Sequence, residues 1–150
     1  MKAKAVLVEL SDWQAAQPLA APIRFTVFVE EQKVPVEMEI DEWDPQCVHA
    51  LARSDTGDVV GTGRLLPDGH IGRMAVLAGA RGLGVGSALL RSLMEEARRR
   101  GHAATVLSAQ THAIPFYQRH GYVVVSGEYL DAGIPHVDMR CELPDRSATG

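Results

Sequence analysis

The segment that decides the fold is Arg81-Gly82-Leu83-Gly84-Val85-Gly86-Ser87. It follows the strand-like run Ile71 to Leu77 and opens a stretch whose apolar residues recur at helical spacing. Glycines at such a junction let the backbone approach a ligand closely, because they carry no Cβ. The free N–H groups of the helix's first turn and the helix dipole then favour a phosphate group. We interpret the segment as a phosphate-binding site in which Arg81 supplies a further cationic contact. The alternative is that the glycines allow only close packing at the start of a helix.

Two other phosphate-binding motifs do not fit these residues. A P-loop needs Gly-Lys followed by Ser or Thr, whereas this segment ends Gly86-Ser87-Ala88. A dinucleotide fingerprint needs glycine or alanine in place of Ser87 and an acidic residue about 20 positions on. The next strand instead ends Ser108-Ala109-Gln110. The ligand is therefore expected to be neither an NTP held by a P-loop nor NAD.

A long helix is predicted to follow, from Gly82 to about Arg100. Arg98 to Arg100 lie where the helix dipole favours cations, and Gly101 can adopt the left-handed conformation that ends a helix. This explains the arginines better than a nucleic-acid patch does. The apolar positions of the helix are Leu83, Leu89, Leu90, Leu93, Met94 and Ala97.

The remaining elements predict an α/β fold with a mixed central sheet flanked by helices. Upstream we expect a strand at 5–9, a helix capped by Ser11 or Asp12 and broken by Pro18 and Pro22, and a second helix with Pro22 in its first turn. A hairpin, 49–53 with 59–65, follows around the turn 54–58. Downstream we expect strands at 105–108, 122–129 and 136–141 and a short helix at 113–120. Residues 1–150 are predicted to form a single domain with a frayed tail at 144–150.

Composition excludes several classes of function. The 150 residues are 46% hydrophobic and 23% charged, with a formal net charge of -4, which disfavours nucleic acid and anionic membranes as partners. Cys47 and Cys141 form no disulfide framework, and the Cys47-x-His49 pair has no second pair at zinc spacing, so we expect no metal. We find neither a signal-peptide core nor a run of about 20 apolar residues, so a cytoplasmic location is expected.

Arg81-x-x-Gly84-x-Gly86 resembles the Q/R-x-x-G-x-G/A motif of the GNAT N-acetyltransferases. The resemblance implies the GNAT acyl-CoA N-acyltransferase fold and acetyl-CoA as acyl donor, with its pyrophosphate on the backbone amides of the motif. In the family the preceding strand carries a bulge that contacts the acetyl carbonyl and the pantetheine arm. The residues implied in donor binding here are Met74, Ala75, Val76, Arg81, Gly82, Leu83, Gly84, Val85, Gly86, Ser87, Phe116 and Tyr117.

Two further stretches support the resemblance. Residues 113–122, AIPFYQRHGY, are similar to the family's A-x-x-F-Y-x-x-x-G-F segment, whose tyrosine commonly protonates the departing thiolate. Here that tyrosine is Tyr117, which could otherwise be a core aromatic. Residues 27–35 and 133–136 resemble one bacterial GNAT branch, whereas Pro18 and Pro22 depart from the family's smoother first helical region.

The implied reaction is attack of a primary amine on the thioester through a tetrahedral intermediate. A backbone amide within Met74 to Val76 would hold the oxyanion and Tyr117 would supply the acid. The base is left open among Glu30, Glu31, Glu128 and His136; His136 could equally satisfy hydrogen bonds within its strand. The alternative function is a non-catalytic acyl-CoA sensor or an interaction protein on the same fold.

The acceptor is expected to be a small molecule. An acidic loop follows Glu30 and Glu31, and its carboxylates would attract a cationic amine, unless it is an ordinary solvated loop. A homodimer is one assembly that the resemblance implies, although nothing in the composition points to it. The loop carboxylates are Glu37, Glu39, Asp41, Glu42 and Asp44.

Overall fold

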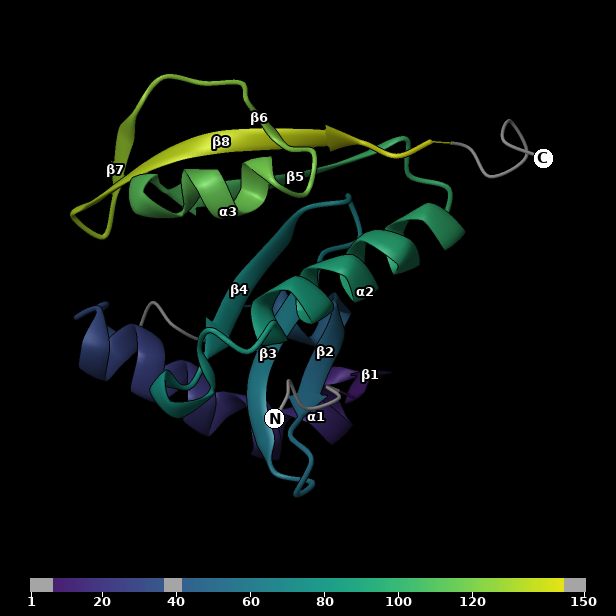
Figure 1. The fold of residues 1–150 in the computed structure, drawn as a ribbon, viewed down its shortest axis with the longest axis vertical. Coiled ribbons are helices and arrows are strands. Elements are labelled where there is room, and N and C mark those ends of the chain that lie inside the picture. Colours follow the sequence, from purple (N-terminus) through teal and green to yellow (C-terminus); the bar gives the residue numbers. More distant parts are fainter. Residues whose placement is uncertain (1–6, 37–41, 145–150) are drawn as a thin grey trace.

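The first sheet has four antiparallel strands in the order β1-β2-β3-β4 (Figure 1). The strands are β1 (Leu7–Ser11), β2 (Val48–Arg53), β3 (Val59–Leu65) and β4 (Ile71–Val76). The predicted β2–β3 hairpin is confirmed, and its turn is closed by the Ser54 N–H, which donates to Asp58 O at 2.9 Å. This computed structural model describes residues 7–36 and 42–144; the first two residues of the strand expected at 5–9, and all but the first residue of the expected tail, lie outside them.

Helix α1 (Trp13–Arg24) begins as predicted, because Asp12 accepts a hydrogen bond from the Ala15 N–H at 2.9 Å. The predicted break at Pro18 and Pro22 is wrong. The helix runs through both prolines and continues directly into a π-helix, η1 (Phe25–Glu31). Both prolines lie on the exposed face, where the carbonyls that lose a helical partner remain accessible to water.

The second sheet is built around β8 (Ile134–Glu142), which pairs with β5 (Ala104–Gln110), β6 (Val123–Val124) and β7 (Tyr129–Asp131), all antiparallel. The single strand predicted at 122–129 is therefore wrong. Its middle leaves the ladder because the Ser126 hydroxyl accepts from the Asp138 N–H at 2.8 Å in place of a backbone partner. A side chain that satisfies the backbone in this way competes with strand pairing.

Helix α2 (Val85–Arg99) joins the two sheets into one core. Its buried residues Leu89, Leu90 and Leu93 belong to the same apolar cluster as Leu65 of the first sheet and Met139 of the second. The shorter helices are η3 (Asp44–Gln46), η4 (Ala78–Ala80), η5 (Thr111–Ala113) and α3 (Ile114–Gln118). None of the helices in the described part of the chain has the length and apolarity needed to cross a membrane.

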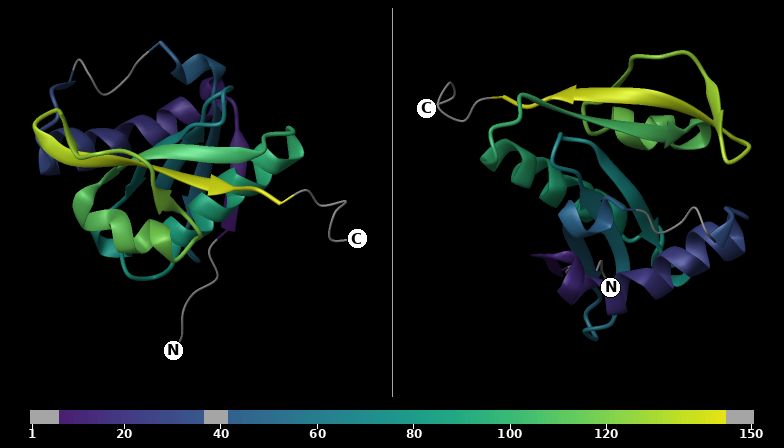
Figure 2. Two further views of the ribbon diagram at one scale, coloured as in Figure 1. Left: turned by 90° about the horizontal axis from the view of Figure 1, so that it is seen from above. Right: turned by 180° about the vertical axis from the view of Figure 1, so that it is seen from behind.

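Between the sheets, the described residues form one parallel bridge, His70 with Val106. Beyond that bridge β4 and β5 run apart, and the two views of Figure 2 show the second sheet splayed over the first. The predicted α/β architecture of sheet and flanking helices is confirmed, with the sheet built as two antiparallel halves joined at this parallel bridge. The divergence of β4 from β5 opens the space in which the site lies.

Candidate active site

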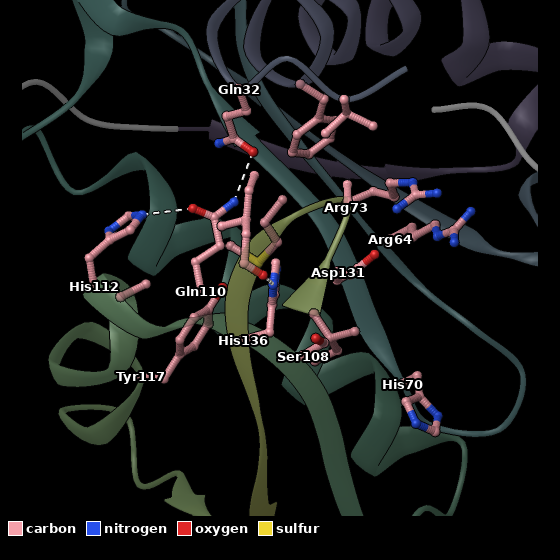
Figure 3. Close-up of a pocket in the computed structure, with 18 of the residues that line it drawn as sticks. Gln32, Arg64, His70, Arg73, Ser108, Gln110, His112, Tyr117, Asp131 and His136 are labelled. Carbon is pink, nitrogen blue, oxygen red and sulfur yellow. Dashed lines mark hydrogen bonds between the residues drawn. The ribbon is translucent and has the colours of Figure 1, made fainter. Parts of the chain in front are cut away.

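A cavity of about 520 Å³ lies between the diverging strands (Figure 3). It is lined by β4 through Arg73 and Met74 and by β5 through Ser108 and Gln110. Tyr117 of α3 and His136 of β8 face the same cavity, so the predicted acid and one predicted base meet in one place. The divergence of the sheets thus creates a pocket of the size that small molecules occupy.

Strand β4 carries the bulge that the resemblance implied. Its register with β3 shifts between Thr62 and Arg64, and Arg73 opposite them has a left-handed φ of 49°. Past the bulge, the Leu77 N–H donates to Val60 O on β3. Because successive residues of a strand direct their backbone groups to opposite sides, the amide and carbonyl of Val76 point away from β3. At this edge of β4 the Val76 carbonyl accepts from Arg81, and the Val76 amide is the group that faces a ligand next to the bulge.

The glycine segment forms a second hollow, of about 420 Å³, at the start of α2. Gly82 and Gly84 have φ of 79° and 83°, and a Cβ at either would meet no atom within 4 Å. Because both residues have left-handed backbone, the right-handed helix cannot include them, and it begins at Val85 and not at the predicted Gly82. The hollow is lined by Val76, Ala80, Arg81, Gly82, Gly84, Val85, Gly86, Ser87, Phe116 and Arg119.

Two polar side chains at this hollow already have hydrogen-bond partners. The Arg81 guanidinium donates to Val76 O at 2.8 Å and to Glu31 Oε1 at 2.6 Å. The Ser87 hydroxyl is hydrogen-bonded to His120 Nε2 at 2.9 Å. Leu83 is 49% exposed and lines neither hollow. The groups in this hollow that can bind an anion are therefore the backbone amides of the glycine segment, with Arg81 at its edge.

Tyr117 keeps its hydroxyl proton over the whole working range of pH. Its ring packs edge-on against Phe116 and Tyr122, and burial raises its pKa to about 12. Within the described residues the hydroxyl has no hydrogen-bond partner, and the side chain borders the large cavity. The group is thus a donor whose partner must come from the cavity.

His136 has one ring nitrogen held by the backbone, which leaves the other for a ligand. Its Nδ1 lies 2.7 Å from the carbonyl oxygen of Ile134, which only accepts, so Nδ1 carries a proton and Nε2 is the nitrogen left for proton exchange. The side chain is buried, and its ring stacks on Tyr129 with centroids 6.1 Å apart. Of the two ring nitrogens, Nε2 is therefore the one through which His136 could act as a base.

The family model for the acetyltransferase (GNAT) domain matches residues 14–143. The chain belongs to the GNAT family. It is 44% identical over 121 residues to an uncharacterized N-acetyltransferase of Bacillus subtilis, YjcF, covering 78% of this chain and 86% of the relative. The GNAT assignment makes the protein an acyltransferase enzyme.

Solved structures agree with this assignment. An acyl-CoA N-acyltransferase from Pseudomonas aeruginosa is 31% identical with a TM-score of 0.81, covering 91% of this chain and 99% of the other. ElaA from Escherichia coli is 26% identical with a TM-score of 0.82, covering 92% and 100%. The predicted GNAT fold is thereby confirmed.

The other predicted bases do not line the cavity that holds Tyr117 and His136. Glu30 and Glu128 are exposed, and neither lines either hollow; Glu31 is bound to Arg81. Of the four candidates, the structure brings His136 alone together with Tyr117.

The acidic loop differs from its predicted form. Asp44 is completely buried, and its carboxylate binds Arg24 at 2.9 Å and Arg64 at 2.8 Å. Burial alone would raise the pKa of Asp44, but the two arginines outweigh it and hold the pKa below its usual value. Asp44 is therefore a structural anchor and not part of a solvated loop. Glu37, Glu39 and Asp41 lie outside the described residues, and Glu42 is exposed.

A chain of hydrogen-bonded polar side chains crosses the cavity wall and has no counterpart among the residues predicted from the sequence. The Gln110 amide donates to Gln32 at 2.8 Å and accepts from His112 at 2.7 Å, as drawn in Figure 3. Gln32 and Gln110 are 78 residues apart, so no local pattern joins them. Arg64, Arg73, Ser108, Arg119 and Asp131 were missed for the same reason, although the bulge implied for β4 pointed to the neighbourhood of Arg73.

Proposed function

We propose that the protein transfers the acetyl group of acetyl-CoA to the primary amine of a small molecule. The observation that carries this proposal is the pairing of two hollows, one at the glycine segment and one between β4 and β5. Val76 lines the first and Met74 the second, so β4 runs from one hollow into the other. A pyrophosphate in the first and an amine in the second would place the thioester along this strand.

The donor fits the first hollow for two reasons. Gly82 and Gly84 leave open space where any other residue would carry a Cβ, so a phosphate can reach the backbone amides. The N-terminus of the 15-residue α2 points its free N–H groups there. Arg119, which also lines the hollow, adds a second cation beside Arg81.

The residues of the second hollow divide the chemistry among them. The neutral Nε2 of His136 takes a proton from the ammonium, directly or through water, because only a free amine attacks a thioester. The nitrogen then adds to the carbonyl carbon, and a β4 amide, with Val76 the best oriented, stabilises the oxyanion. Collapse breaks the C–S bond, and Tyr117 donates its hydrogen to the sulfur that leaves. The product amide nitrogen loses its remaining surplus proton to solvent, Tyr117 regains a proton from solvent, and His136 releases the one it took, so that one proton is released per turnover.

A cavity of about 520 Å³ between two packed sheets supports a small acceptor. The formal net charge of -4 disfavours nucleic acid as the partner. A lysine-bearing peptide is the comparison acceptor that tests this assignment.

The test combines donor binding with turnover. Calorimetry is expected to detect acetyl-CoA binding, with no comparable heat from NAD or ATP. Gly84→Val places a branched side chain in the hollow and forces φ of 83° on a β-branched residue, so it should weaken donor binding at least tenfold. Gly57→Ala, a left-handed glycine in the distant β2–β3 turn, is the control for backbone strain. Equal acetyl-CoA affinity in Gly84→Val, or no thiol release with any amine, would overturn the proposal.

A further inference from the structure

The fixed charges of the large cavity are unevenly distributed. Among the described residues that line it, Arg64 and Arg73 carry permanent positive charge and Asp131 carries negative charge. Figure 3 shows the two arginines and Asp131 toward one end, with Tyr117, Gln110 and His112 toward the other. The cavity thus has a charged end that the acetyl-transfer chemistry does not use.

Arg73 is held in this position by the bulge. It is one of three residues other than glycine with positive φ in the described chain, and its φ of 49° lies on a strand, not in a turn. A long side chain in this conformation is under strain that the neighbouring Gly72 could have carried more easily. Strain of this kind persists where the surrounding structure holds a side chain in a required direction.

Arg64 supplies a second guanidinium in a fixed orientation. It pairs in register with Gly72, the residue before Arg73, so the two arginines lie on neighbouring strands next to the bulge. The buried Asp44 carboxylate holds Arg64 at 2.8 Å, and Asp44 is itself held by Arg24. A guanidinium fixed in this way loses little entropy when it binds a planar anion.

We infer that the acceptor carries a carboxylate within a few bonds of its amine, and that Arg73, with Arg64 behind it, binds that carboxylate. The inference rests on the proposed acetyl transfer. Arg73 directly precedes the Met74 to Val76 stretch where the thioester is proposed to lie, so an anion at Arg73 is close to the reacting nitrogen. Short amino acids, such as α-amino acids and β-alanine, have this separation.

The experiment compares matched acceptors in the presence of acetyl-CoA. Each amino acid is paired with its carboxamide, which keeps the amine and the size but removes the negative charge; spermidine and propylamine complete the panel. Thiol release gives kcat and KM for wild type, Arg73→Gln, Arg73→Lys and the control Arg140→Gln. Arg140 is exposed on β8, is paired with Glu142 and lines neither hollow. Arg64 is left unchanged because its loss would break a buried ion pair.

Wild type should prefer the carboxylate over its carboxamide by about tenfold or more in kcat/KM, as charge-assisted hydrogen bonds give. Arg73→Gln should remove this preference through KM, with little effect on carboxamides, and Arg73→Lys should keep part of it. Arg140→Gln should behave as wild type.

Turnover of carboxamides, propylamine or spermidine without a preference for carboxylates would overturn the inference and leave acetyl transfer standing. Equal losses on both members of a pair in Arg73→Gln would also overturn it, because they would show a structural role. If no amine of any class releases thiol, acetyl transfer itself fails and the inference fails with it.

Discussion

The Arg81 guanidinium lies 2.6 Å from the Glu31 carboxylate, joining the first residue of the glycine motif to the end of the π-helix η1. The side chains are 46% and 36% exposed, so the pair contributes at most about 1 kcal/mol to stability. Its position matters more than its strength, because it places one negative charge at the edge of the hollow proposed for the pyrophosphate.

Glu31→Gln should therefore act on the donor and not on the chemistry. Removing the negative charge favours the anionic acetyl-CoA, and KM for acetyl-CoA should fall by up to about fivefold at low salt, less at high salt. kcat should stay within about twofold of wild type. Glu30→Gln, on the same helix and outside both hollows, is the matched control. A large loss of kcat in Glu31→Gln alone would make Glu31 the base.

Tyr117→Phe should lower kcat by about 10²-fold or more and leave acetyl-CoA affinity and melting temperature nearly unchanged, since the ring contacts remain. Because the pKa of Tyr117 is about 12, its hydroxyl stays protonated, and wild-type kcat should show no decline from this group below about pH 11. The checks are steady-state kinetics across pH and calorimetry. An unchanged kcat, with chemistry shown to limit turnover, would make Tyr117 a packing residue.

His136→Gln should lower kcat/KM by about 10²-fold or more, because the variant has no imidazole nitrogen to take the proton of the ammonium. The measurement is kcat/KM for His136→Gln and for Glu128→Gln, an exposed carboxylate that should keep the wild-type value. A wild-type kcat/KM in His136→Gln would exclude His136 as the base.

Asp44→Asn should destabilise the fold by about 3–5 kcal/mol at pH 7, because two buried guanidinium groups lose their shared carboxylate. The pKa of Asp44 is lowered by folding, so its contribution is complete above the unfolded value of about 3.8 and disappears as pH falls through the folded value. Urea unfolding at a series of pH values should show wild type approaching the variant only in acid. A constant difference at all pH values would mean that the carboxylate's charge is not what stabilises the fold.

Much of the fold could be predicted because local chemistry determines it. The turn at 54–58 sets the β2–β3 hairpin, Asp12 caps α1, and apolar spacing marks α2. The glycine segment could be recognised because three alternating glycines between a strand and a helix are visible in the sequence itself.

What could not be predicted depends on contacts between distant residues. α1 continues past Pro18 because tertiary packing of its other face outweighs the local cost of the proline. Asp44 is buried because Arg24 and Arg64 meet it from 20 residues away on either side. The cavity wall depends likewise on the long-range pair of Gln32 with Gln110.

Direct acetyl transfer is best tested by a single-turnover reaction with acetyl-labelled acetyl-CoA, followed by mass spectrometry of acceptor, coenzyme and intact protein. Direct attack predicts that N-acetylated amine and free coenzyme A appear together in equal amounts, that the protein carries no label at any time, and that Tyr117→Phe slows both products equally. Label on the protein before it reaches the amine, or release of the acetyl group as acetate with the amine unchanged, would contradict the account.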